Sequence, residues 1–297
     1  MVMRRGGYYF AVALIVPLTL GMASIPRGTW HYDLDHPTAR VTLPAELAEV
    51  SALTDIDAHT VACVQDEQGA VYLVDIVTGK VTGKSVFASP GDYEGLTRVG
   101  DRLYALRSDG LIHRLKKVGG HYIQEDTFRV QVPNQNIEGL GFDERKQVML
   151  IAAKDNLKGD KVARDERFIY GWDLRTNRQL PKPLLTLSVE RIAEEARALG
   201  VDLPMRRTPK GQDRLDFKLR PSSIAMHLTE DRYYLLSAQD HALLVLDRQG
   251  VLRELIFLDP VLFPKPEGIT FQADGTLLIS NEGKDMQPNL LLFKMKT

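Results

Sequence analysis

The fold is decided by a four-residue stretch, Glu94-Gly95-Leu96-Thr97, that returns with variations four more times along the chain. Each copy has an acidic or hydroxyl residue, then a small residue, then Leu or Ile, then another small residue. The other copies are Ser51-Ala52-Leu53-Thr54, Glu138-Gly139-Leu140-Gly141, Ser222-Ser223-Ile224-Ala225 and Glu267-Gly268-Ile269-Thr270. Successive copies begin 43, 44, 84 and 45 residues apart. A period in the forties, with several strands in each unit, is typical of β-propeller blades.

The residues between the copies read as strands joined by tight turns. In the second unit, residues 102–106 and 111–115 are two strand-like runs on either side of Ser108-Asp109-Gly110. Such a turn favours a hairpin, because glycine adopts positive φ angles without steric cost. The sequence therefore predicts an all-β protein, a five-bladed β-propeller. Six blades are the alternative, if a degenerate unit fills the 84-residue step.

The two ends of the repeat array are expected to meet. The last unit has apolar runs at residues 276–280 and 289–293, and no outer strand follows them. A further strand-like run, residues 39–43, precedes the first complete unit. We expect this N-terminal strand to close the last blade, since an open edge would leave backbone groups unpaired.

A helical insertion is expected between the third and fourth blades, at about residues 188–218. Ser188 can cap the helix, one apolar face follows it, and Gly200 can end it. We expect the insertion to pack on one face of the ring. The propeller domain then covers residues 39–297, and residues 27–38 form a linker.

The N-terminal segment differs in kind from the repeats. Arg4 and Arg5 precede a run from Gly6 to Pro26 that contains no charged residue. Such a run is typical of a secretory signal and is also long enough to span a bilayer. Residues 1–26 are therefore expected to be a signal peptide or an N-terminal membrane anchor. The basic residues before the run predict that the rest of the chain lies outside the cytoplasm.

Composition narrows the range of partners and chemistries. The chain has 38 basic and 39 acidic side chains and no basic stripe, so nucleic acid is not expected as a partner. Cys63, the only cysteine, lies in an apolar strand and is expected to be a core residue. The sequence contains neither a nucleophile elbow nor a glycine-rich phosphate loop.

The first residue of each copy is expected to face the central channel, because innermost blade strands line it. Three glutamates, Glu94, Glu138 and Glu267, would then converge and repel one another. Raised pKa values, nearby Lys or Arg side chains, or a bound cation would relieve this repulsion. Oxygen ligands without clustered His or Cys favour Ca²⁺, and Mg²⁺ less strongly, over zinc. We predict that these glutamates bind such a cation; the alternative is that they only link blades through hydrogen bonds to the backbone.

Other polar residues are expected around the same mouth of the channel. They lie either two residues before a motif copy or in the turn that follows the next strand. They are Glu49, Asp66, Glu67, Asp92, Asp109, Lys154, Asp240, Asn281 and Glu282. We predict that they line a ligand-binding site.

The ordered set of these segments resembles the SdiA-regulated (YjiK-like) family of bacterial β-propeller proteins. The resemblance runs from Leu43 almost to the C-terminus. It includes Gly91-Asp92-Tyr93-Glu94-Gly95, Asn136-Ile137-Glu138-Gly139-Leu140, Pro266-Glu267-Gly268-Ile269-Thr270 and Ser280-Asn281-Glu282-Gly283. The first copy departs from the family pattern in having Ala52 where glycine is common. The resemblance implies a propeller outside the cytoplasm, in the periplasm, behind a membrane anchor or signal. It implies no established reaction.

Three roles are compatible with this pattern, and the third is a purely structural one as an envelope interaction module. The first is a non-enzymatic, cation-binding propeller that binds a small molecule or an envelope protein, and that contacts the membrane through the N-terminal segment if this segment is not cleaved. The alternative is a Ca²⁺-dependent hydrolase resembling phytase or lactonase propellers, in which the ion polarises the substrate or activates water. For the hydrolase, the candidate catalytic acids or bases are Lys154, Asp240 and Glu282.

Overall fold

The computed structural model describes residues 31–134, 136–155, 165–283 and 286–296. The predicted signal or anchor, residues 1–26, lies outside the described residues. Within the described ranges, no helix is long and apolar enough to cross a membrane.

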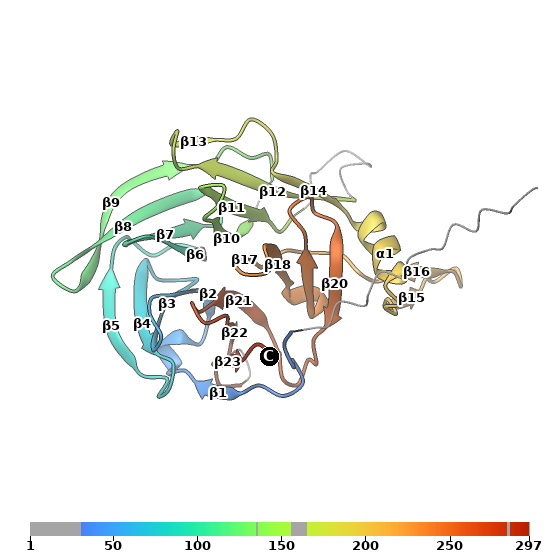
Figure 1. The fold of residues 1–297 in the computed structure, drawn as a ribbon, viewed down its shortest axis with the longest axis horizontal. Helices are drawn as coiled ribbons and strands as arrows, with labels where there is room; N and C mark the ends of the chain where they lie inside the picture. The colour runs from blue at the N-terminus through green and yellow to red at the C-terminus, as the bar shows by residue number, and fades with distance from the viewer. Residues whose placement is uncertain (1–30, 135, 156–164, 284–285, 297) are drawn as a thin grey trace, which may run out of the picture.

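Five antiparallel sheets form a ring around a central axis (Figure 1). In each sheet the chain runs outward from an innermost strand. The first two blades are β2 (Val50–Asp55), β3 (Thr60–Gln65), β4 (Ala70–Asp75) and β5 (Val81–Val86), then β6 (Tyr93–Val99), β7 (Arg102–Arg107), β8 (Leu111–Val118) and β9 (His121–Arg129). The third is β10 (Ile137–Asp143), β11 (Val148–Ala153), β12 (Glu166–Asp173), β13 (Arg178–Gln179) and β14 (Leu185–Ser188). The fourth is β17 (Ser223–His227), β18 (Arg232–Ser237), β19 (Ala242–Leu246) and β20 (Leu252–Phe257). The predicted five-bladed propeller is confirmed, and the six-bladed alternative is wrong.

The fifth blade joins the two ends of the repeat array, as predicted. It consists of β21 (Pro266–Phe271), β22 (Leu277–Asn281), β23 (Asn289–Phe293) and β1 (Ala39–Thr42). β1 runs antiparallel to β23, with Ala39 opposite Leu292 and Thr42 opposite Asn289. The N-terminal strand therefore supplies the outer strand of the last blade and pairs backbone groups that would otherwise be exposed.

Four of the five motif copies begin with a β-bulge. The pairing of β6 with β7 shifts between Tyr93 and Gly95, so Glu94 is an extra residue in the ladder. The same shift occurs at Ser51, Glu138 and Glu267. A bulge redirects a side chain and is frequent next to functional sites. The bulge therefore explains how a glutamate at the start of an otherwise apolar strand can be turned toward the channel.

The small second residue of the motif is required by packing between blades. A Cβ added to Gly95 would lie 2.7 Å from Leu140 Cβ and 2.8 Å from the Glu138 carbonyl oxygen. A Cβ on Gly268 would lie 2.4 Å from Leu53 Cδ2. Leu140 and Leu53 are the third motif residues of the adjoining blades. Each of these glycines therefore receives the Leu or Ile of the next copy, and Gly139 receives Ile224 in the same way.

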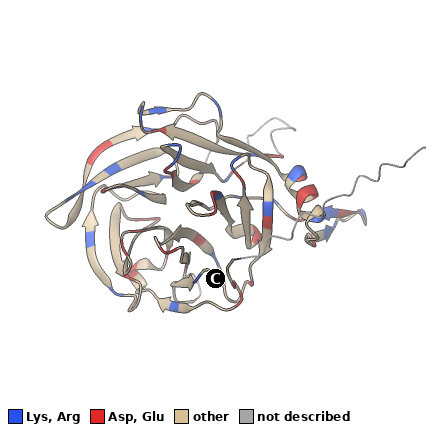
Figure 2. Ribbon diagram, in the orientation of Figure 1, with Lys and Arg blue, Asp and Glu red and all other residues tan. Residues whose placement is uncertain are grey.

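Apolar clusters fill the spaces between neighbouring blades. Cys63 belongs to the cluster between the last and first blades, and it is completely buried. Burial raises the pKa of its thiol to about 12, so the thiolate does not form near neutral pH. Basic and acidic positions are interspersed over the blades, in agreement with the balanced composition (Figure 2).

The 84-residue step contains an insertion between blades three and four. Helix α1 (Val189–Ala198) is capped by Ser188, whose hydroxyl accepts a hydrogen bond from the Arg191 amide at 3.1 Å. The helix contacts β14 and β20, the outer strands of these blades, so it lies at the rim of the ring (Figure 1). The expected position on a face of the ring is therefore wrong. A separate hairpin, β15 (Met205–Arg207) and β16 (Asp213–Leu215), follows the helix.

Candidate functional site

The three motif glutamates, Glu94, Glu138 and Glu267, gather at the mouth of the channel where the innermost strands begin, the glutamate mouth. The side chains of Glu138 and Glu267 are almost completely buried, and Glu94 is partly buried. The charges of Glu138 and Glu267 both act on Glu94, which agrees with the predicted convergence on the axis.

Two lysines neutralise two of these glutamates. Lys154 Nζ lies 2.6 Å from Glu138 Oε1. Lys265 Nζ lies 3.3 Å from Glu267 Oε1 and 2.6 Å from Glu282 Oε1. Burial disfavours the charge of Lys154, but Glu138 outweighs it and raises the pKa of this lysine. Both ammonium groups therefore stay charged and act as internal counter-ions.

Glu94 has no such partner. No described residue forms an ion pair or hydrogen bond with its carboxyl group. Burial, followed by the charges of Glu138 and Asp92, raises the pKa of Glu94 to about 9. Burial also raises the pKa of Glu138, to about 7, although Lys154 opposes this shift. At neutral pH the mouth therefore holds a protonated Glu94 beside a glutamate that titrates close to neutrality.

A smaller group of carboxylates adjoins this one. Asp66 lies beside Glu49 and Glu282, and burial followed by the charge of Glu49 raises the pKa of Asp66 to about 7. Lys265 connects the two groups, because it binds both Glu282 and Glu267. Six predicted residues thus lie around the mouth, namely Glu49, Asp66, Glu67, Asp92, Lys154 and Glu282.

Three predicted residues do not join this group. They are Asp109, Asp240 and Asn281. Arg107 binds Asp109 at 2.7 Å and, with a second arginine, holds the pKa of that carboxyl well below its usual range. Asp240 accepts a hydrogen bond of 2.5 Å from a serine hydroxyl in its own turn. The buried amide of Asn281 donates to Asn289 at 3.1 Å.

The two serine copies of the motif bind the backbone. Ser222 Oγ donates to the carbonyl of Pro266 in the next blade at 3.3 Å. Ser51 Oγ donates to the carbonyl of Glu49 at 3.0 Å. A hydrogen bond between blades, the alternative role considered for the glutamates, is thus made by Ser222 but not by Ser51, whereas two of the three glutamates bind lysines.

The oxygen-only donor set suits Ca²⁺ or Mg²⁺ by chemistry. In the described ranges, however, no group of three or more His, Cys, Asp or Glu side chains is placed to hold a metal ion. Lys154 stands 2.6 Å from one of the three predicted ligands. Binding a divalent cation there would require Lys154 to turn away and Glu94 to lose its proton.

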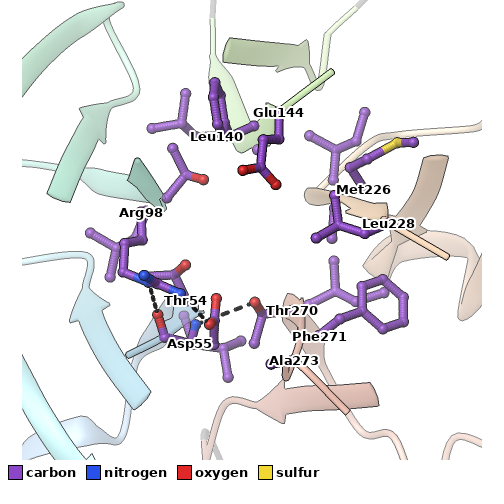
Figure 3. A pocket seen from close by; sticks show the side chains of 18 of the residues that line it. Thr54, Asp55, Arg98, Leu140, Glu144, Met226, Leu228, Thr270, Phe271 and Ala273 are labelled. Atoms are coloured by element: carbon purple, nitrogen blue, oxygen red, sulfur yellow. Dashed lines mark hydrogen bonds and ion pairs between the residues drawn. The ribbon is translucent and has the colours of Figure 1, made fainter. Parts of the chain in front are cut away.

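The opposite mouth of the channel, the second mouth, holds a pocket of about 280 Å³ (Figure 3). It begins at the Leu and Ile residues of the five motif copies and extends toward the C-terminal ends of the innermost strands. Its wall contains the fifth residue counted from each motif start, namely Asp55, Arg98, Phe142, Met226 and Phe271. Sequence reasoning missed this pocket, although continuing the two-residue alternation along each strand would have indicated it.

Comparisons with known proteins extend the description of the fold. No protein-family model matches the chain, and neither does any curated protein. Among solved structures, glutaminyl cyclase from Myxococcus xanthus is similar, with a TM-score of 0.58 and 14% identity over 88% of this chain and 96% of that one. A luciferin-regenerating enzyme gives a TM-score of 0.46 and 10% identity, over 88% of this chain and 97% of that one. At such identities the likeness concerns the fold alone. The chain is a five-bladed β-propeller similar in fold to a glutaminyl cyclase, and no family is assigned to it.

Proposed function

We propose that this protein is a non-enzymatic propeller outside the cytoplasm that captures a cation at the glutamate mouth. The bound cation would then anchor a small molecule or an envelope protein. Ca²⁺ is the best-suited ion, because it accepts six to eight oxygen ligands in flexible geometry. The observation that carries the proposal is the position of Glu94, a partly buried carboxyl that lies among other carboxyls and has no ion-pair partner in the described residues; this burial raises its pKa to about 9.

A cation would take over the role that the proton has in the present arrangement. Glu94 holds its proton because burial and the neighbouring carboxylates disfavour a further negative charge. A divalent ion would remove this repulsion and allow Glu94 to ionise. The side chain of Lys154 is 25% exposed, so it can turn toward solvent and release Glu138.

The test is thermal unfolding of the full-length chain with calcium, with magnesium and with a chelator. A ligand that binds only the folded state stabilises it by RT ln(1 + [L]/Kd), about 2.7 kcal/mol at a hundredfold excess over Kd. We expect a calcium-specific rise in Tm that is lost in Glu94→Gln. Glu194→Gln, on the exposed side of α1, is the matched control. An unchanged Tm in calcium would leave the glutamates with a structural role only.

A hydrolase is the second candidate, and one observation favours it. Glu94 and Glu138 are neighbours whose pKa values are about 9 and about 7. Carboxyls with separated pKa values can act as a general acid and a general base. Lys154, a predicted catalytic candidate, contacts Glu138, whereas Asp240 lies outside this group. Phosphate esters and lactones are the substrates to assay, with and without calcium, and Glu138→Gln should abolish any turnover.

A further inference from the structure

We propose that the pocket at the second mouth binds a small amphiphilic cation, a molecule with a compact apolar body and one amine group. This pocket shares no lining residue with the glutamate mouth. The inference therefore does not depend on the cation-binding function proposed above.

The walls of the pocket suit an apolar body. Eleven of its nineteen lining residues are apolar, and they come from all five innermost strands and the turns that follow them. Leu228 is 49% exposed at the edge of the pocket, so apolar surface remains in contact with water. Covering such surface is favourable by about 25 cal/mol per Å².

The charged residues of the pocket leave one negative charge without a partner. Arg98 binds Asp55, with Nη2 2.6 Å from the carboxylate and Nε 2.7 Å from the carbonyl oxygen, so this pair neutralises itself. Glu144 points into the pocket (Figure 3). In the described part of the chain, no residue forms a hydrogen bond or ion pair with its carboxylate. The adjoining Arg145 binds Asp231 instead, at 2.9 Å. A cationic group is therefore favoured over an anionic one.

The size of the pocket limits the ligand. Its volume of about 280 Å³ lies just below the roughly 300–1,000 Å³ of sites for drug-sized molecules. One aromatic ring or one branched aliphatic chain fits this space. Thr54, Thr97 and Thr270 also line the pocket, and a threonine hydroxyl can accept or donate a hydrogen bond; that of Thr270 already accepts one from the Asp55 amide at 3.4 Å.

Three probes of similar shape test the chemistry. They are 2-phenylethylamine, 2-phenylethanol and 3-phenylpropionate, titrated into the full-length chain by calorimetry and by ligand-observed NMR. We expect the amine to bind more tightly than the alcohol by about tenfold in Kd, or about 1.4 kcal/mol, and the carboxylate to bind most weakly. Equal affinity for the three probes, or no saturable binding of the amine, would overturn the proposal.

Variants locate the binding. Glu144→Gln should reduce amine affinity to that of the alcohol, whereas Glu194→Gln should change nothing. Ala273→Trp, at an exposed lining position, should block the alcohol and the amine alike, and Val77→Trp on the outside of the first blade is its control. If Glu94→Gln abolished amine binding and Glu144→Gln did not, the amine would bind at the glutamate mouth and the proposal would be wrong.

Discussion

The two mouths of the channel balance their charges in different ways. At the glutamate mouth, bulged glutamates are compensated from outside the motif, by Lys154 and Lys265, and Glu94 keeps a proton. At the second mouth, Arg98 and Asp55 occupy equivalent positions on neighbouring inner strands and neutralise each other directly. The first arrangement leaves a group that can exchange its proton for a cation. The second leaves only Glu144 available for a ligand, on an apolar wall.

Both mouths depend on the close approach of the inner strands, so the largest loss of stability should come from a substitution that prevents this approach. We expect Gly95→Val to destabilise the protein by about 3 kcal/mol or more, because the new side chain would overlap Leu140 and the Glu138 carbonyl. Urea unfolding measures this change as a lower midpoint. Gly83→Ala is the control, since its Cβ would make only ordinary contacts, the nearest at 3.4 Å. A wild-type midpoint for Gly95→Val would contradict the packing role given to the motif.

Removing Lys154 should make the glutamate mouth dependent on an external cation. Lys154→Met leaves Glu138 without its counter-ion, and we expect a loss of about 1–3 kcal/mol in the presence of chelator. Calcium should restore stability and bind more tightly than in the wild type, because the competing ammonium is gone. Thermal unfolding with calcium and with chelator measures both effects, and exposed Lys182→Met is the control. A variant that calcium does not stabilise would contradict the idea that Lys154 stands in for a cation.

The proton on Glu94 predicts a dependence of stability on pH. Its pKa is about 9 in the folded protein against an ordinary value of 4.5, so the folded state holds more protons between these values. The free energy of unfolding should therefore fall as pH rises through this range. Glu94→Gln removes this contribution, and we expect it to exceed the wild type by about 1–2 kcal/mol near pH 9 but not near pH 4.5.

Urea titrations across this pH range, in the presence of chelator, give the comparison for Glu94. The pKa values of Glu138 and Asp66 are also raised, to about 7, so in both proteins the free energy of unfolding should still fall with rising pH below that value. The difference between wild type and variant isolates Glu94. Parallel curves would mean that Glu94 does not titrate with a raised pKa.

The sequence predicts the ring because the repeated residues are the ones that pack. Gly95 and Gly268 receive Leu140 and Leu53 from the adjoining blades, so motif residues pack against motif residues. This packing places each copy at an equivalent position around the axis, and the glutamates that begin three of the copies therefore converge.

The surroundings of the glutamates do not follow from the repeat. Whether a carboxylate joins the site depends on nonrepeated neighbours, such as Arg107, which holds Asp109 away from the others. The apolar face of α1 predicts that it packs, but not that it packs on β14 and β20 at the rim. The first motif position alone does not indicate the pocket at the second mouth, because later positions of the same strands line it.

The smallest effect should come from the ion pair at the second mouth. Arg98 Nη2 lies 2.6 Å from Asp55 Oδ2, but the two side chains are 35% and 22% exposed, so solvent screens the interaction. Arg98→Met should cost about 0.2–1 kcal/mol in urea unfolding and should leave the pH dependence of Glu94 unchanged. It should also raise the affinity of the pocket for 2-phenylethylamine, because Asp55 becomes a second uncompensated carboxylate beside Glu144. If the variant instead altered calcium binding, the two mouths would be coupled, and their separation along the channel would not make them independent sites.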